Sequence, residues 1–215
     1  MKPYRTVLKA AGDEQIIQRS RFIGDASPAA SAEEALAFLE AVRARHRDAT
    51  HHCYAYIIGQ NAGIMRYSDD GEPSGTAGLP IIEVMKARGV VDCCVVVTRY
   101  FGGVLLGAGG LTRAYAHTCA IALDAAGVCV MHPTETWLAE VPYALWDRVR
   151  HELAGLPARL ESTEFTSAVA FEFSVKAQDS QRVRDCLARV TDGRAEMLLE
   201  GERHSPYHSD RKSVV

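Results

Sequence analysis

One stretch of the sequence constrains the fold more than any other, the nearly unbroken apolar run from Val91 to Thr98. A strand that is apolar at almost every position is typical of a sheet covered on both faces. A glycine-rich loop, Gly102 to Gly110, follows, and then a helix predicted from about Leu111 to Ala126 and ended by Gly127. The sequence therefore predicts a central strand, then a glycine-rich loop, then a helix that covers the sheet.

The rest of the first half supplies further elements for this sheet. Residues 4–8 and 14–25 are expected to be extended, with a turn at Gly12-Asp13. Ser31 and Glu34 form a capping box, which predicts a helix from about Ser31 to Arg47. Residues 52–58 and 64–68 predict a hairpin, and a helix beginning near Pro80 should end at Gly89.

The second half has a different order of predicted strands and helices. Extended segments are expected at 134–141, 159–165, 169–175 and 196–201, and helices at 143–153 and 180–190. The order βαββαβ is that of the split-βαβ, ferredoxin-like arrangement. The expected fold class is therefore α+β, with a first domain over residues 1–127, a ferredoxin-like second domain over 128–203 and a polar tail over 204–215.

Charge and cysteine content narrow the classes of function. The net charge of −3 argues against a basic nucleic-acid module, because phosphate binding needs an excess of Lys and Arg. The cationic group at Arg43, Arg45, His46 and Arg47 is explained by the negative end of its helix, although it could also face phosphates. Six cysteines without a C-x-x-C pair are typical of buried free thiols and of the cytoplasm. We expect neither a signal peptide nor a membrane span.

An acidic cluster, Asp69, Asp70 and Glu72, lies in the loop that runs to Gly78 and includes Thr76. Such carboxylates could hold a divalent cation, for which Mg²⁺ is the candidate, or they could pair with an arginine. The simpler interpretation is a surface turn, since Asp, Gly, Pro and Ser favour turns. We therefore expect no resident metal or cofactor, and these three carboxylates are the only weak candidates for a metal site.

A second candidate cluster ends the central strand, and a third follows it. The second contains Thr98, Arg99, Tyr100, Phe101, Gly102 and Gly103, and the third contains Gly107, Gly109, Gly110, Arg113 and Tyr115. Arg99 could bind a phosphate or carboxylate ligand, or it could neutralise the acidic cluster. The glycines could let backbone amides approach an anion, or they could serve close backbone packing.

Named catalytic motifs are missing. No Walker A lysine follows Gly107, and Thr112 stands where the dinucleotide fingerprint needs its third glycine. His117 has no partner at metal-ligand spacing, and no G-x-S-x-G elbow occurs. The sequence assigns no catalytic residue and favours a protein that is not an enzyme.

The three clusters together resemble the signature of the IMPACT/YigZ family. The matching segments are Asp69 to Gly78, Val95 to Gly103 and Leu106 to Tyr115, with Ser20-Arg21-Phe22 and His52 to Tyr56 as further likenesses. The resemblance implies a first domain like domain 2 of ribosomal protein S5 and a second domain like the ferredoxin-like domains of elongation factors. The eukaryotic relatives regulate translation, and they carry an RWD domain that has no counterpart in these residues.

Two functions from different classes follow. The first is a non-enzymatic binding protein linked to translation regulation, whose partner is the ribosome, RNA or a translation-related protein. The alternative is an enzyme or sensor for a small phosphate-containing ligand, with Gly107 to Gly110 and Arg99 on the anion and Mg²⁺ on the acidic cluster. A third interpretation makes the clusters a rigid platform in which Arg99 and the acidic loop satisfy each other, beneath a protein-binding surface.

Overall fold

The computed structural model describes residues 1–206, and they fall into two compact units. One unit is Tyr4–Val130, and the other combines Met1–Pro3 with the chain from Met131 onward. The division lies inside the strand β7 (Val128–Val141), close to Gly127, the predicted end of the first domain. Mixed helices and strands in both units confirm the α+β class.

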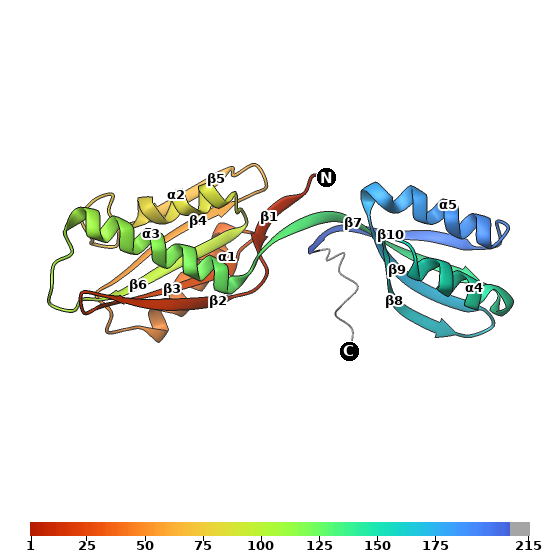
Figure 1. Ribbon diagram of the computed structural model, residues 1–215, viewed down its shortest axis with the longest axis horizontal. Coiled ribbons are helices and arrows are strands. Elements are labelled where there is room, and N and C mark those ends of the chain that lie inside the picture. The colour runs from red at the N-terminus through yellow and green to blue at the C-terminus, as the bar shows by residue number, and fades with distance from the viewer. Residues whose placement is uncertain (207–215) are drawn as a thin grey trace. The chain divides into compact units, whose positions relative to one another are not determined.

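The first unit is built on a five-stranded antiparallel sheet in the order β2-β3-β6-β4-β5 (Figure 1). Its strands are β2 (Ala11–Ile17), β3 (Ser20–Pro28), β4 (His51–Ile58), β5 (Ile64–Ser68) and β6 (Cys93–Tyr100). The helices are α1 (Ala32–Arg45), α2 (Gly78–Arg88) and α3 (Gly107–Ala126). A short strand, β1 (Tyr4–Val7), pairs with β7.

Strand β6 is central and buried on both faces, as its composition predicts. Cys93, Val95 and Val97 belong to the core beneath α2 and α3, whereas Cys94 and Val96 belong to a separate core beneath α1. Figure 1 shows α1 on the opposite side of the sheet from α2 and α3. The unbroken apolar run follows from this two-sided burial.

The helix and hairpin predictions in this unit are largely confirmed. Ser31 caps α1 by accepting a hydrogen bond from the Glu34 amide at 3.2 Å, and the Glu34 carboxylate accepts one from the Ala30 amide at 2.8 Å. Gly89 ends α2 in the left-handed conformation (φ 64°). The β4–β5 hairpin has the predicted pairing, from Tyr54 opposite Ser68 to Ile58 opposite Ile64.

The predicted turn at Gly12-Asp13 is wrong. Gly12 lies inside β2, and an added Cβ there would stand 2.4 Å from the Gly24 carbonyl oxygen of β3. The glycine therefore serves a close approach of two strands. The chain turns instead at Gln18 and Arg19, both at positive φ (45° and 69°), as in a two-residue hairpin turn.

The predicted glycine-rich loop is also too long. Helix α3 begins at Gly107, so only residues 101–106 form the loop, and Gly107, Gly109 and Gly110 belong to the first turn of the helix. An added Cβ at Gly110 would lie 2.9 Å from the Cβ of Leu106. Close packing of the loop against the helix start explains that glycine.

The second unit has the element order β7-α4-β8-β9-α5-β10 and the strand order β10-β7-β9-β8. The additional elements are α4 (Tyr143–Ala154), β8 (Ala158–Phe165), β9 (Val169–Lys176), α5 (Ser180–Val190) and β10 (Glu196–Pro206), with a short 3-10 turn at Ala177–Asp179. Alternate residues of β9, among them Phe171 and Phe173, pack under the helices together with Trp146.

The first residues of the predicted polar tail, 204–206, belong to β10. His204 and Pro206 continue β10 opposite Pro133 and Met131 of β7, and the Ser205 and Thr134 hydroxyls are hydrogen-bonded at 2.7 Å. Strand β7 is long enough to pair with these additional residues of β10. The remainder of the predicted tail, 207–215, lies outside the described residues. Among residues 1–206, no helix combines the length and apolar character that crossing a bilayer requires.

Candidate functional site

Asp69 organises the loop between β5 and α2. One carboxylate oxygen, Oδ1, accepts hydrogen bonds from the Ala77 and Gly78 amides at 3.0 and 2.8 Å, and Oδ2 accepts one from the Gly75 amide at 2.8 Å. Ala77 itself offers no side-chain cap to α2. The carboxylate therefore caps the helix from outside it and places a negative charge at the positive end of the helix dipole.

Asp70 and Gly71 turn the chain toward β4. Asp70 has φ 44° and Gly71 has φ 88°. The Asp70 carboxylate accepts the His52 amide at 2.7 Å and approaches the Arg43 guanidinium at 3.3 Å. The Asp70 carbonyl oxygen lies 2.8 Å from His51 Nδ1, so this residue joins the acidic loop to the start of β4.

Glu72, Arg99 and Tyr115 form a buried triad. The Glu72 Oε1 atom lies 2.6 Å from Arg99 Nη1 and accepts a hydrogen bond from the Tyr115 hydroxyl at 2.7 Å. The Glu72 and Arg99 side chains are only 3% and 6% exposed. A buried charge of either sign is costly without its partner, so the triad ties the acidic loop, β6 and α3 into one unit.

Aromatic rings and Ser20 complete the surroundings of Arg99. Its guanidinium carbon stands 5.3 Å from the ring centres of Phe22 and Phe101. Ser20 Oγ lies 3.4 Å from Arg99 Nη2 and accepts the Gly102 amide at 3.1 Å. Arg99 therefore neutralises the acidic loop, which is one of the two roles that the sequence leaves open.

Burial shifts the titration of two groups beside the triad. It raises the pKa of Tyr115 far above its ordinary value, and the Cys53 and Glu72 neighbours act in the same direction. Burial also raises the pKa of the Cys53 thiol, which donates to the Asp69 carbonyl oxygen at 2.9 Å. Both groups therefore remain protonated at neutral pH, and the Tyr115 hydroxyl acts as a donor to Glu72.

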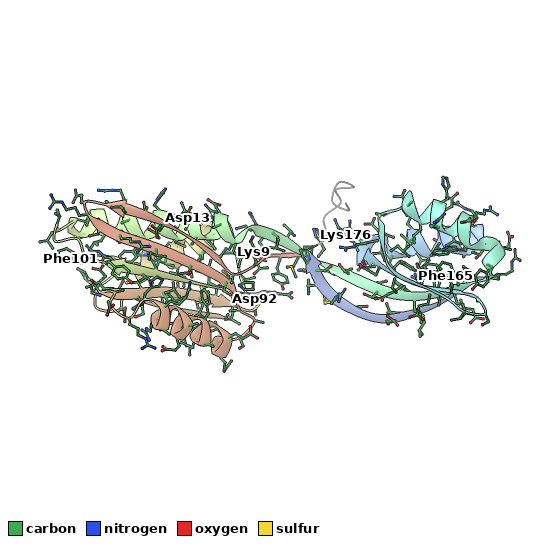
Figure 2. The ribbon with its side chains drawn as sticks, turned by 90° about the horizontal axis from the view of Figure 1, so that it is seen from below. Lys9, Asp13, Asp92, Phe101, Phe165 and Lys176 are labelled. Carbon is green, nitrogen blue, oxygen red and sulfur yellow. The ribbon has the colours of Figure 1, made fainter. Side chains whose placement is uncertain are left out.

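The loop over residues 101–106, called the exposed loop below, presents apolar side chains to solvent. Leu105 is 84% exposed, Phe101 46% and Val104 38%. Phe101 marks one end of the first unit in Figure 2, and Asp92, just before β6, marks the other. Such a group of apolar side chains on one loop is typical of a binding surface.

Two exposed cations border the exposed loop. The Arg19 backbone lies against Gly102, where an added Cβ would stand 2.2 Å from its carbonyl carbon. Arg113 is on the second turn of α3, with Nη1 3.6 Å from an added Cβ at Gly109. Within residues 1–206, neither guanidinium forms an ion pair.

The structure separates the predicted site residues into an inner and an outer set. The inner set holds Asp69, Asp70, Glu72, Thr76, Thr98, Arg99, Tyr115 and, at the edge, Tyr100. The outer set holds Phe101, Gly103, Gly107, Gly109 and Arg113. Gly102 packs against the Arg19 backbone and Gly110 against the Leu106 side chain. The described residues include no group of three His, Cys, Asp or Glu placed to hold a metal ion.

Several contributors could not be selected from residue type alone. Ser20, Phe22 and Cys53 contact the triad or its loop, and they lie in segments that carry the family resemblance. Gln15 and His117 are hydrogen-bonded across β2 and α3 at 2.8 Å, a contact between positions far apart in sequence. The period-2 pattern of β2 was the available signal, because it sends Gln15 to the same face as Ile17.

The thiols offer a test of this packing. We expect one cysteine, Cys129, to react first with a thiol reagent at pH 8 in the native protein, since it alone is half-buried and the other five are buried. Burial raises the pKa of Cys129 as well, but the reagent can reach its side chain. Burial raises the pKa of Cys94 and Cys119 to about 12, which removes the reactive thiolate. Counting the modified thiols by mass spectrometry, with Cys129→Ser as the control, checks this. Rapid native modification of the Cys129→Ser protein would contradict it.

The fold and these contacts define a two-domain α+β protein in which a buried ionic triad supports an exposed apolar loop. The chain belongs to the IMPACT family. Residues 18–123 match the Impact N-terminal domain, and residues 140–194 match a domain of unknown function, DUF1949.

Relatives match along most of the chain. IMPACT family member YvyE of Bacillus subtilis is 38% identical over 199 residues, covering 93% of this chain and 91% of that protein. An IMPACT family member from Thermus thermophilus is 44% identical over 193 residues, covering 86% of this chain and all of that protein. A crystal structure described as a hypothetical protein matches with a TM-score of 0.58 and 30% identity, over 92% of this chain and 97% of that one.

Proposed function

We propose that the chain is a non-enzymatic binding protein linked to translation, and that it contacts RNA or the ribosome through the exposed loop with Arg19 and Arg113. The observation that carries the proposal is the 84% exposure of Leu105 beside Phe101 and Val104, on a loop whose base is fixed by the triad. The apolar and aromatic side chains can contact the bases of RNA or the apolar side chains of a protein, and the unpaired arginines can contact phosphates. The likeness to translational regulators supplies the biological setting.

The internal pairing of the inner set supports a binding role over an enzymatic one. Asp69 and Asp70 accept backbone amides, and Glu72 faces Arg99. A phosphate ligand on Arg99 would have to displace Glu72 in a buried site, which is costly. A Mg²⁺ ion at these carboxylates would likewise compete with the amides and the guanidinium that they already face, so the proposal includes none.

The proposal extends to the fold relationships and the cellular location. The strand order β10-β7-β9-β8 with two helices supports a ferredoxin-like second domain. The likeness of the first unit to domain 2 of ribosomal protein S5 rests on the family resemblance of its sequence. Six free cysteines support a cytoplasmic location.

Sedimentation with purified ribosomal subunits across a salt series tests the proposal. We expect Leu105→Asp to weaken binding about tenfold, because an exposed apolar anchor is lost without a change in the core. Arg19→Glu should weaken binding and reduce the slope of log affinity against log salt by about one. Arg150→Glu, on the second unit, is the matched control and should bind as the wild type does.

Two results would count against this function. One is a wild-type protein that does not sediment with subunits or bind RNA even at low salt. The other is equal weakening by Leu105→Asp and the control Arg150→Glu, which would place the contact away from the exposed loop.

A further inference from the structure

A surface pocket of about 270 Å³ lies between β2 and α3, beside the exposed loop. The residues that line it include the apolar Ile17 and Leu106 and the polar Gln15, Arg113 and His117. None of the residues that line it is acidic. The pocket therefore offers cationic and neutral donors with no carboxylate to neutralise them.

The hydrogen bonds of Gln15 fix the orientation of its amide group. Its Nε2 atom donates to the Ala114 carbonyl oxygen at 3.1 Å and to Thr118 Oγ1 at 2.5 Å. Thr118 Oγ1 in turn donates to the same carbonyl oxygen at 2.7 Å. A carbonyl oxygen can only accept, so the amide nitrogen of Gln15 must face Ala114.

The same network fixes the tautomer of His117. Gln15 Oε1 lies 2.8 Å from His117 Nδ1, and this oxygen can only accept. His117 Nδ1 therefore carries a proton, so Nε2 is an acceptor in the neutral ring and a second N–H donor in the imidazolium form. In residues 1–206, Nε2 has no hydrogen-bond partner.

Arg113 and His117 are four residues apart on α3, so their side chains share one face of the helix. Arg113 has no ion pair within the part of the chain that the structure describes, although a guanidinium readily takes a carboxylate or phosphate. Both side chains line the pocket, and His117 is oriented by Gln15, so the pair is suited to the oxygens of an anion such as phosphate.

We propose that this pocket is a phosphate subsite in which the Arg113 guanidinium and the Nε2–H group of the His117 imidazolium donate to the oxygens of a phosphate monoester. Ile17 and Leu106 contact the group attached to the phosphate. The source is either the terminal phosphate of an RNA or a free small phosphate ester. The inference deepens the proposed function, on which it rests because Arg113 belongs to both surfaces. Gly110 lets Leu106 lie close to the start of α3, because a side chain at position 110 would displace the Leu106 side chain.

A titration with inorganic phosphate tests the subsite, followed through the His117 ring resonances at fixed pH and ionic strength. We expect saturable shifts with millimolar affinity, and Arg113→Gln should weaken the affinity about tenfold or more, because a charge-assisted contact is lost. Arg148→Gln, an exposed arginine on α4, is the matched control and should titrate as the wild type does. Non-saturating shifts of equal size in the wild type and Arg113→Gln would overturn the proposal.

A second arm identifies the source of the phosphate. A 5′-phosphorylated oligoribonucleotide that binds more tightly than its 5′-hydroxyl form, with the difference lost in Arg113→Gln, would assign the subsite to RNA ends. Equal binding of the two oligonucleotides, together with saturation by inorganic phosphate, would assign it to a free ester. Leu105→Ser, which removes the apolar anchor without adding a charge, should weaken ribosome binding and leave the phosphate titration unchanged, so failure of the subsite and failure of ribosome binding remain distinguishable.

Discussion

Replacing Arg99 by alanine should lower the free energy of unfolding of the first domain by about 3–5 kcal/mol, because the variant leaves the Glu72 carboxylate buried without its cation. The Tyr115 hydroxyl and, at 3.9 Å, His51 Nε2 would then face that charge. The expected loss is a large part of the stability of a typical domain. The exposed Arg19, changed to alanine, should alter stability by no more than about 0.5 kcal/mol and is the control.

The positions of the two tryptophans make this measurement selective. Trp137 and Trp146 both belong to the core of the second unit. In a urea titration, tryptophan fluorescence therefore reports the second domain, and far-ultraviolet circular dichroism reports both. Arg99→Ala should shift the dichroism transition to lower urea while the fluorescence midpoint stays in place.

The size of the loss separates two roles for Arg99. A loss of several kcal/mol identifies a structural cation that holds the acidic loop, β6 and α3 together. A loss below about 1 kcal/mol would contradict that role, since it is the range of an exposed ion pair. It would also restore the interpretation in which Arg99 is held for an external anion.

Replacing Asp69 by alanine should cost the first domain about 3 kcal/mol, because hydrogen bonds to a charged acceptor and a helix cap are lost together. Three backbone amides, those of Gly75, Ala77 and Gly78, would lose their acceptor. The same urea titration by dichroism measures the effect. Amide hydrogen exchange should also become faster at Gly75 and at the start of α2.

The neighbouring carboxylate provides the control for Asp69. Asp70 accepts one backbone amide, that of His52, and its ion pair with Arg43 is partly exposed. Asp70→Ala should therefore cost less than Asp69→Ala. An equal or larger loss for Asp70→Ala would contradict the assignment of Asp69 as the residue that organises the loop.

Local rules predicted the elements whose signals are local. The apolar run of β6, the capping box of α1 and the Gly89 end of α2 each depend on residues close in sequence. The turn at Gln18-Arg19 was missed because neither residue is a preferred turn former at positive φ. The Gly102 contact with the Arg19 backbone comes from a distant part of the chain.

The role of a glycine also depends on neighbours that the local sequence does not reveal. Gly12 and Gly110 were interpreted as turn and loop residues, yet both permit close backbone packing within regular elements. A glycine has the same appearance in the sequence whether it provides positive φ or space for a neighbour. Only the position of the neighbouring segment distinguishes the two.

The sequence by itself determined that the chain has an α+β fold, that β6 is buried on both faces and that Asp69 to Tyr115 holds the candidate residues. Hydrophobic periodicity and capping chemistry act over a few residues, so a sequence contains them in full. The tertiary structure alone decided that Arg99 faces Glu72, that Asp69 caps α2 and that Gln15 orients His117. Two of these contacts join segments far apart in the chain, and the Asp69 contact depends on the path of the loop before α2, so the fold determines which of these groups meet.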